Sequence, residues 1–240
     1  MSLLETRNIV KRYGSRTVVD GVSLQVNSGA VVGLLGPNGA GKTTSFYSIA
    51  GFIRPDGGNI LYDNEVITNL PIHKRALKGI SYLAQEPSVF KKLTVEENVR
   101  IILEPLGLNK REIDNRIDEL MADLGIEYLR KNKGHALSGG ERRRVEIMRA
   151  LSTRPKFILL DEPFAGIDPL AVNDLQTLIY SLKAKGLGIL ISDHNVRETL
   201  QVCDFAYIMN EGQILTSGVA DDIIESEVAR KMYLGENFHM

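Results

Sequence analysis

The sequence contains a single cysteine, Cys203, among 240 residues. One thiol cannot form an internal disulfide, and the apolar residues around it indicate a buried thiol in a reducing compartment. The 29 lysines and arginines are balanced by 30 aspartates and glutamates, so no global positive field favours nucleic acid. No apolar run approaches the roughly 18 residues that cross a bilayer, and charges interrupt the N-terminal apolar residues, which argues against a signal peptide. Any action at a membrane is therefore expected to depend on another chain that spans it.

The strongest motif follows an apolar run, Val31–Leu35. Residues 36–43 match the phosphate-binding pattern G-x-x-x-x-G-K-[ST]. Its glycines let successive backbone N–H groups face phosphate oxygens, which a Cβ would obstruct. Lys42 supplies charge toward the outer phosphates, Thr43 can ligate Mg²⁺, and the N-terminus of the following helix favours an anion. The sequence therefore predicts a nucleoside triphosphate site made of Gly36, Pro37, Asn38, Gly39, Ala40, Gly41, Lys42, Thr43 and Thr44.

An aromatic residue, Tyr13, precedes this motif. Residues 3–9 and 17–26 alternate in a way that predicts two paired antiparallel strands on either side of it. The tyrosine ring could stack on a nucleotide base, because every base has a π-face. A turn tyrosine that packs on the sheet explains the residue equally well, so from the residues alone both interpretations stay open.

Three further apolar runs end in polar residues that could reach a ligand at the carboxyl edge of a sheet. Residues 80–85 predict a short strand that ends in Gln85, which could contact Mg²⁺ or the attacking water, although a solvated loop glutamine is the alternative. The run from Phe157 ends in Asp161, expected to hold Mg²⁺ through water, and Glu162, expected to polarise the attacking water. Residues 186–193 lead to His194, which can donate to a γ-phosphate or orient a water, although alone it would more often be an ordinary histidine.

Between these runs, from Thr94 to about Ala150, helical patterns replace strand patterns. The apolar residues of 109–124 form one stripe, which favours core packing over a partner groove: Ile113, Ile117, Leu120 and Leu124. Ser138 is expected to cap a later helix, where Gly139 and Gly140 leave backbone N–H groups open to a second anion. The arginines of residues 141–149 are interpreted as a solvated helix face rather than a nucleic-acid site.

The order of these motifs resembles that of ATP-binding-cassette (ABC) ATPases. The resemblance rests on the P-loop, Gln85, LSGGE at 137–141, FILLDE at 157–162, AGID at 165–168 and His194. The resemblance covers nearly the whole chain, and LSGG separates this family from other P-loop proteins. It implies an α/β fold: a P-loop NTPase (RecA-like) core with N-terminal antiparallel β-strands and an inserted α-helical subdomain. The expected boundaries are 1–86 and 151–225 for the core, 87–150 for the helical subdomain and 226–240 for a C-terminal tail of one domain.

The resemblance also implies roles for individual residues. ATP and Mg²⁺ are the expected ligands, with Tyr13 on the adenine and with Thr43, Gln85 and Asp161 at the metal. Glu162 becomes the general base and His194 the residue at the γ-phosphate. The family acts as a head-to-tail homodimer, in which the P-loop of one copy and Ser138, Gly139 and Gly140 of the other clamp one ATP, while Asp168 lies in a loop that crosses the interface. Glu141 stands where many members have glutamine, and we expect this difference to tune the interface rather than to abolish activity.

Within the family, three segments resemble the ATPases that power lipopolysaccharide export: SGGERRRVEIMRALSTRPKFILLDEPFAGIDP, SDHNVRETLQVCDFAYI and MYLGENF. This implies the transmembrane partners LptF and LptG with LptC, a location at the cytoplasmic face of the inner membrane, and membrane contact only through partners. The alternative is the ATPase subunit of branched-chain amino acid importers, which shares LTVEEN at 93–98. A partner's coupling helix is expected at Pro87–Lys92, with Phe90 exposed, although Phe90 could instead pack locally. ABC proteins of ribosomes or DNA carry two cassettes or long inserted coiled coils, and neither pattern is found here.

Overall fold

The computed structural model describes residues 1–166 and 169–235. The chain divides into two compact units, Met1–Tyr82 with Lys156–Met240, and Leu83–Pro155. We call the first the core unit and the second the helical unit, and each is described by itself.

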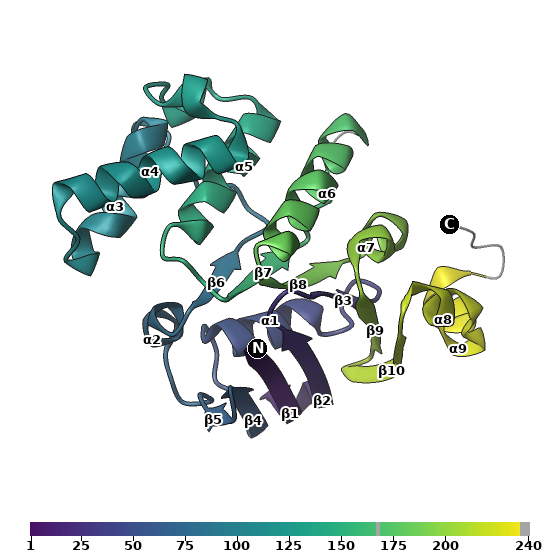
Figure 1. The fold of residues 1–240 in the computed structure, drawn as a ribbon. Helices are drawn as coiled ribbons and strands as arrows, with labels where there is room; N and C mark the ends of the chain where they lie inside the picture. The colour runs from purple at the N-terminus through teal and green to yellow at the C-terminus, as the bar shows by residue number, and fades with distance from the viewer. Residues whose placement is uncertain (167–168, 236–240) are drawn as a thin grey trace. The chain divides into compact units, whose positions relative to one another are not determined.

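The core unit is built on two β-sheets (Figure 1). Among the described residues, the first sheet has the order β2-β1-β4-β5 and is antiparallel. Its strands are β1 (Leu3–Tyr13), β2 (Arg16–Asn27), β4 (Gly57–Tyr62) and β5 (Glu65–Val66). The second sheet has the order β10-β9-β3-β8-β7-β6. Its strands are β3 (Val31–Leu35), β6 (Ile80–Leu83), β7 (Phe157–Asp161), β8 (Gly188–Asp193), β9 (Phe205–Asn210) and β10 (Gln213–Gly218).

The burial pattern of each strand follows from its sequence. Every residue of β3, β7 and β8 is buried, as continuous apolar runs predict for central parallel strands. β3 pairs in parallel with β8 on one side and β9 on the other. The two N-terminal strands pair as expected. β9 and β10 pair in antiparallel fashion around the turn at residues 211–212.

Helix α1 (Lys42–Ala50) lies between the two sheets and contacts strands of both. Its Phe46 and Ile49 belong to a fully buried cluster with Leu34, Ile60 and Phe157. Helices α6 (Pro169–Ala184) and α7 (Val196–Val202) pack on β8 from the other side (Figure 1). Because the helix that follows the P-loop is fixed by both sheets, the position of the loop depends on the packing of the whole core unit.

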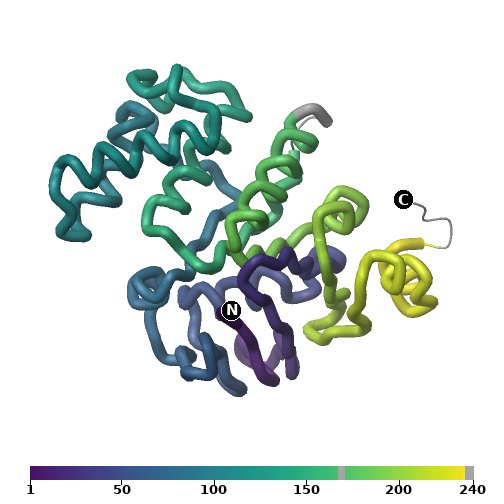
Figure 2. Tube along the Cα trace, viewed as in Figure 1, coloured from purple at the N-terminus to yellow at the C-terminus, as the bar shows by residue number. Residues whose placement is uncertain are grey.

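A C-terminal group of short helices packs beside β9 and β10, as the trace in Figure 2 shows. It consists of α8 (Ala220–Glu225), α9 (Glu227–Ala229) and a π-helical turn, η4 (Arg230–Leu234). Ile223 and Ala229 are buried there with Leu35 and Ile208. Nearby, Cys203 precedes β9; the residue is only partly buried, and burial of its sulfur raises the pKa of the thiol.

A buried arginine supports the end of α1. Arg75, in α2 (Ile72–Leu77), is 1% exposed. Its guanidinium donates to the carbonyls of Ser48 and Ile49, each at 2.6 Å, and to those of Leu70 and Thr68, each at 2.8 Å. Burial lowers its pKa to about 10. The cation thus satisfies carbonyls in the last turn of α1, where the helix dipole favours positive charge.

The helical unit contains α3 (Val95–Leu103), α4 (Lys110–Leu124) and α5 (Gly139–Leu151), linked through the short turns η1 (Glu104–Leu106), η2 (Glu127–Leu129) and η3 (Gly134–Ala136). Each of the three α-helices begins with a capping box, formed by Thr94, Asn109 and Ser138 respectively. All members of the predicted stripe on α4 are buried, so its interpretation as core packing is confirmed.

The arginines of α5 do not form the solvated face that we expected. Arg143 donates to the Ala84 carbonyl at 3.1 Å and pairs with the buried Glu146, also at 3.1 Å. Arg144 donates to the Leu124 carbonyl at 2.8 Å. Arg149 donates to the carbonyl of Ser88. The expectation is wrong because these side chains bind carbonyls of segments that precede α5 by many residues, and they hold the helical unit together.

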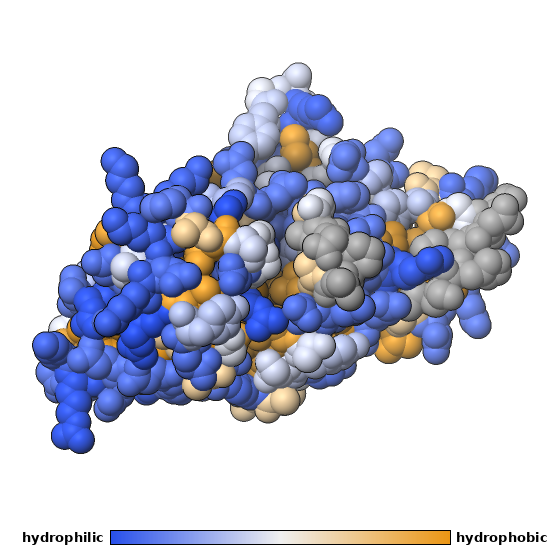
Figure 3. Space-filling model, turned by 90° about the horizontal axis from the view of Figure 1, so that it is seen from above, coloured by the Kyte–Doolittle hydropathy of each residue, from blue (hydrophilic) through white to orange (hydrophobic). Residues whose placement is uncertain are grey.

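In residues 1–166 and 169–235, no helix combines the length and the apolar composition needed to cross a bilayer. Figure 3 shows one face of the molecule, on which hydrophilic residues predominate and apolar residues form separate small groups.

Candidate nucleotide site

The predicted P-loop leaves the end of β3 and enters α1, as its sequence indicates. Two of its glycines have no room for a side chain: a Cβ on Gly36 would lie 2.0 Å from the Met209 carbonyl oxygen, and one on Gly41 would lie 2.5 Å from the Val18 carbonyl oxygen. Gly41 also has a φ of 105°, which favours glycine. The loop therefore lies directly against the Met209 and Val18 carbonyls, and glycine is required at both positions.

The start of α1 is open to an anion. Gly41 is its N-cap, and among the described residues no side chain caps this end and no acidic residue lies in the first turn. The N–H groups of Lys42, Thr43 and Thr44 have no acceptor within the helix, since the first turn precedes all its carbonyls. A Cβ on Gly39 would meet no atom within 4 Å, so one side of the loop is free. This arrangement fits the phosphates of a nucleotide.

Lys42 is held over the loop. Its Nζ donates to the carbonyls of Gly36 at 2.7 Å and Pro37 at 3.0 Å, and the residue is 5% exposed. Burial lowers the pKa of its ammonium group, while the carboxylates of Glu162, Asp193 and Asp161 oppose this effect. The lysine thus places a positive charge, largely shielded from solvent, between the P-loop and the carboxylates of Asp161, Glu162 and Asp193.

Replacement of Lys42 by alanine should lower the affinity for ATP by roughly tenfold or more, because a hydrogen bond to a charged group contributes about 1.5–3 kcal/mol. Titration with a fluorescent ATP analogue measures the change. Lys183→Ala, which removes an ion pair with Asp204 elsewhere in the core unit, is the matched control and should bind normally. Unchanged affinity in Lys42→Ala would contradict the assignment of the P-loop.

The Asp161 carboxylate lies at the end of β7, beside β8, and is 3% exposed. It accepts hydrogen bonds from the Tyr82 hydroxyl at 3.0 Å and from the Ser192 hydroxyl. No motif in the sequence assigns Tyr82 or Ser192 to the site. The signal was present in part, since the parallel register pairs Asp161 with Ser192, but the apolar runs alone do not fix that register.

Glu162 follows in an unusual backbone conformation. Its φ is +44°, which is rare for a residue other than glycine and is often found at functional sites. Its N–H donates to the Ser192 carbonyl at 2.7 Å, which bridges the ends of β7 and β8. Its Oε2 lies 3.4 Å from Nδ1 of His194, whose side chain is 46% exposed. The structure therefore brings together the two residues that the sequence suggested for the attacking water and the γ-phosphate.

A residue of the C-terminal helices also reaches this place. The hydroxyl of Tyr233 donates to the carbonyl of His194 at 2.9 Å. Burial raises the pKa of this tyrosine, so the hydroxyl stays protonated as a donor. Nothing in the sequence near Tyr233 indicated the contact, which depends on how η4 packs in the folded core unit.

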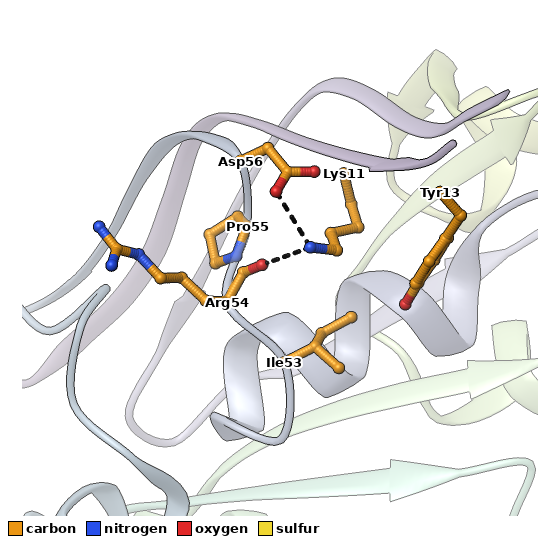
Figure 4. A pocket seen from close by; sticks show the side chains of 6 residues that line it. All are labelled: Lys11, Tyr13, Ile53, Arg54, Pro55 and Asp56. Atoms are coloured by element: carbon orange, nitrogen blue, oxygen red, sulfur yellow. Dashed lines mark hydrogen bonds and ion pairs between the residues drawn. The ribbon is translucent and has the colours of Figure 1, made fainter. Parts of the chain in front are cut away.

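Tyr13 lines a pocket at the end of β1, together with Ile53 and the chain from Arg54 to Asp56 (Figure 4). Lys11 donates to the Arg54 carbonyl at 2.9 Å and to the Asp56 carboxylate at 3.1 Å. The tyrosine is 52% exposed and is not packed into the sheet as a core residue would be. Its ring is thus accessible, and its contact with adenine stays a prediction.

The other residues predicted for the nucleotide site lie in the helical unit or outside the described residues. Gln85, expected at the end of a strand, follows β6 by two residues, because β6 ends at Leu83. The carbonyl of Ala84, between β6 and Gln85, accepts a hydrogen bond from the Arg143 guanidinium. Gln85, Ser138, Gly139 and Gly140 lie in the helical unit, and their part in the nucleotide site stays a prediction. Asp168 lies outside the described residues.

In α5, Glu141 forms a capping box with Ser138. Its carboxylate accepts the Ser138 N–H at 2.8 Å, and its own N–H donates to the Ser138 hydroxyl at 3.3 Å. These bonds lower the pKa of Glu141, the larger effect being that of the Ser138 N–H. A Cβ on Gly139 or Gly140 would meet no atom within 4 Å, so the start of the helix remains accessible.

Two side chains near the P-loop offer oxygen ligands of the kind that Mg²⁺ binds. This ion typically takes one or two protein oxygens and completes its octahedron with phosphates and water. The exposed Thr43 and the carboxylate of Asp161 provide such oxygens. Among the described residues, no group of three or more His, Cys, Asp or Glu side chains forms a site that could hold a metal ion by protein ligands alone.

Comparison with known proteins agrees with this geometry. The family described as ABC transporter matches residues 19–165. The chain is similar to the lipopolysaccharide export system ATP-binding protein LptB of Haemophilus influenzae, with 53% identity over 100% of both chains. Proteins of the same name from Acidithiobacillus ferridurans, with 52% identity over 99% of both chains, and from Escherichia coli K12, with 51% identity over 100% of both chains, are also similar.

Solved structures give the same result. An ATP-binding cassette of an ABC transporter, MJ1267 in its ADP conformation, aligns with a TM-score of 0.88 and 34% identity over 98% of this chain and 100% of that one. A dimeric cassette, MJ0796, shares the fold, with a TM-score of 0.78–0.79 and 23% identity over 90% of this chain and 98% of that one. The chain therefore belongs to the ABC transporter family of ATP-binding proteins, and it is an ABC-type ATPase.

Proposed function

We propose that this ATPase powers the extraction of lipopolysaccharide from the inner membrane and its export toward the outer membrane. The observation that carries the proposal is the identity of 51–53% with LptB proteins over essentially the full length of both chains. The P-loop and the cluster of Asp161, Glu162 and His194 supply the chemistry that such a role requires. The same relatives give no support to the alternative of a branched-chain amino acid importer.

In the proposed reaction, Lys42 and the first N–H groups of α1 bind the phosphates of ATP. Thr43, Asp161 and, from the helical unit, Gln85 would hold Mg²⁺, which neutralises phosphate charge when it is bound. Glu162 takes a proton from the attacking water as the oxygen bonds to the γ-phosphorus and the bond to the β-phosphate oxygen breaks. His194 then donates to an oxygen of the transferred phosphoryl group, and Tyr13 stacks on the adenine.

The complete site is proposed to need two copies of the chain. Ser138, Gly139 and Gly140 of one copy would bind the phosphates held by the P-loop of the other, and Asp168 would lie at the crossing between them. Two properties of α5 support this proposal. A Cβ built on Gly139 or Gly140 would meet no atom within 4 Å, and a helix N-terminus attracts an anion. Closure of the dimer would depend on the γ-phosphate and would loosen on hydrolysis.

The proposed partners are transmembrane subunits like LptF and LptG, with LptC, which would place the chain at the cytoplasmic face of the inner membrane. Phe90 is the proposed contact within Pro87–Lys92. It is 44% exposed, and its backbone is held by the buried Asn98, whose side-chain amide accepts the Phe90 N–H at 2.9 Å and donates to its carbonyl at 3.2 Å. The guanidinium of Arg149 lies 4.5 Å from the centre of the Phe90 ring. An aromatic ring in a fixed backbone suits an apolar partner helix.

Affinity purification from detergent-solubilised membranes tests this function. We expect the tagged chain to retain an LptF and LptG pair, and Phe90→Ala to lose most of it while ATP hydrolysis by the isolated chain continues. Tyr180→Ala, which shortens another exposed aromatic residue, is the control and should retain both partners. Recovery of amino-acid permease subunits would favour the importer, and recovery of ribosomes or DNA at physiological salt would contradict a transport role.

A further inference from the structure

Asp193 is a buried acid that none of the motifs uses. It is the last residue of β8 and is 0% exposed. Its Oδ1 accepts the backbone N–H groups of His194 and Asn195, each at 2.8 Å. Its Oδ2 accepts the backbone N–H of Phe164 at 3.1 Å. Both oxygens of one carboxylate are therefore occupied by backbone donors from two separate segments.

These segments are the loops that carry the two reacting side chains. Phe164 follows Glu162 by two residues, in the loop after β7. The second loop begins directly after β8 with His194. The distance between Glu162 Oε2 and His194 Nδ1 is 3.4 Å, and the distance between Asp193 Oδ1 and the same nitrogen is 3.6 Å. Asp193 thus joins the two loops at the point where their side chains face each other.

A buried carboxylate at this position lowers the stability of the fold unless it makes interactions that a neutral residue cannot make. Burial of a charge is unfavourable, and here desolvation raises the pKa of Asp193 although three backbone N–H groups oppose the shift. An asparagine has one acceptor oxygen, and its amide nitrogen would face a backbone donor. An apolar residue would leave N–H groups of both loops unsatisfied. Only a group with two acceptor oxygens binds both loops at once.

We propose that Asp193 is a positioning residue for ATP hydrolysis, which fixes the loop of Glu162 and the loop of His194 in the relative arrangement that the reaction needs. The inference rests on the proposed roles of Glu162 and His194. It extends them, because it assigns the alignment of the two side chains to a third residue that touches neither ATP nor the attacking water.

The test compares kcat, KM and nucleotide affinity in Asp193→Asn and Asp193→Glu. The first keeps the shape and loses an acceptor, and the second keeps the charge and displaces it by one methylene group. We expect kcat to fall at least tenfold in both variants, while affinity for a fluorescent ATP analogue changes less than threefold, because the P-loop is not altered. In a Glu162→Gln background, Asp193→Asn should cause no further loss, since misplacement matters only while the base is present.

The matched control is Asp204→Asn. Asp204 also accepts a backbone N–H, that of Val31 at 2.9 Å, but at the other end of the parallel strands. We expect this variant to lower the melting temperature without lowering kcat of the folded protein. An Asp193→Asn variant with normal kcat, or one whose rate falls only in proportion to its unfolded fraction, would overturn the inference. If Glu162→Gln itself turned over normally, the proposed function would fail instead, so the two failures are distinguishable.

Discussion

Replacement of Glu162 by glutamine is expected to stop ATP turnover while ATP binding persists. Glutamine has the same shape but cannot accept the proton of the attacking water, and general-base catalysis contributes about 10²–10⁴-fold in rate. The backbone at +44° and the bond from the Glu162 N–H to the Ser192 carbonyl do not depend on the carboxylate. Phosphate release measures the loss, and size-exclusion chromatography with ATP should show a dimer that persists, because the step that releases it is blocked.

Glu211→Gln is the matched control for this variant. Glu211 also has a positive φ, +46°, but lies in the turn between β9 and β10. It should hydrolyse ATP at the rate of the unmodified chain. If Glu162→Gln hydrolysed ATP at that rate too, Glu162 would not be the general base.

Among the proposed variants, Arg75→Met is expected to lower the free energy of unfolding the most. The change removes the donors of four backbone carbonyls, those of Ser48, Ile49, Leu70 and Thr68. Each buried acceptor left unsatisfied costs about 1–3 kcal/mol, and relaxation recovers part of it, so the free energy of unfolding should fall by roughly 3–5 kcal/mol. Because two of the carbonyls lie in the last turn of α1, which follows the P-loop, affinity for ATP should fall as well.

Thermal unfolding followed by circular dichroism measures this effect, with an expected decrease of the midpoint on the order of 10 °C. Arg111→Met, at an exposed position of α4, is the control and should change the midpoint little. Arg75→Lys should lie between, because lysine keeps the charge but cannot reach all four carbonyls from one planar group. A normal midpoint for Arg75→Met would show that water or local rearrangement satisfies these carbonyls.

Local patterns in the sequence predicted the elements that carry the chemistry. The five buried residues of β3 and the glycines that follow are recognisable without knowledge of any distant residue. The same holds for β7, for Asp161 and Glu162 at its end, and for Ser138 as the cap of α5. In each case the physical requirement is met by residues within about ten positions of one another, so a single sequence is sufficient.

The residues that organise the site could not be predicted in this way. Ser192 and Tyr82 become relevant only when β8 and β6 lie beside β7, and that strand order is a property of the whole sheet. The arginines of α5 were misjudged for the same reason, because their acceptors, the carbonyls of Ala84, Ser88 and Leu124, are far away in the sequence. A charged side chain on a helix is interpreted as solvent-exposed when the distant carbonyl that it binds is unknown.

The place of β3 in the sheet also determines when the nucleotide site can form during synthesis. β3 is made early, but its two neighbours, β8 and β9, belong to residues 188–210. The Met209 carbonyl that confines Gly36 comes from the same late segment. A nascent chain released by the ribosome before these strands emerge carries the complete P-loop sequence without the structure that shapes it. We therefore expect ATP to stabilise only chains in which β8 and β9 are already present.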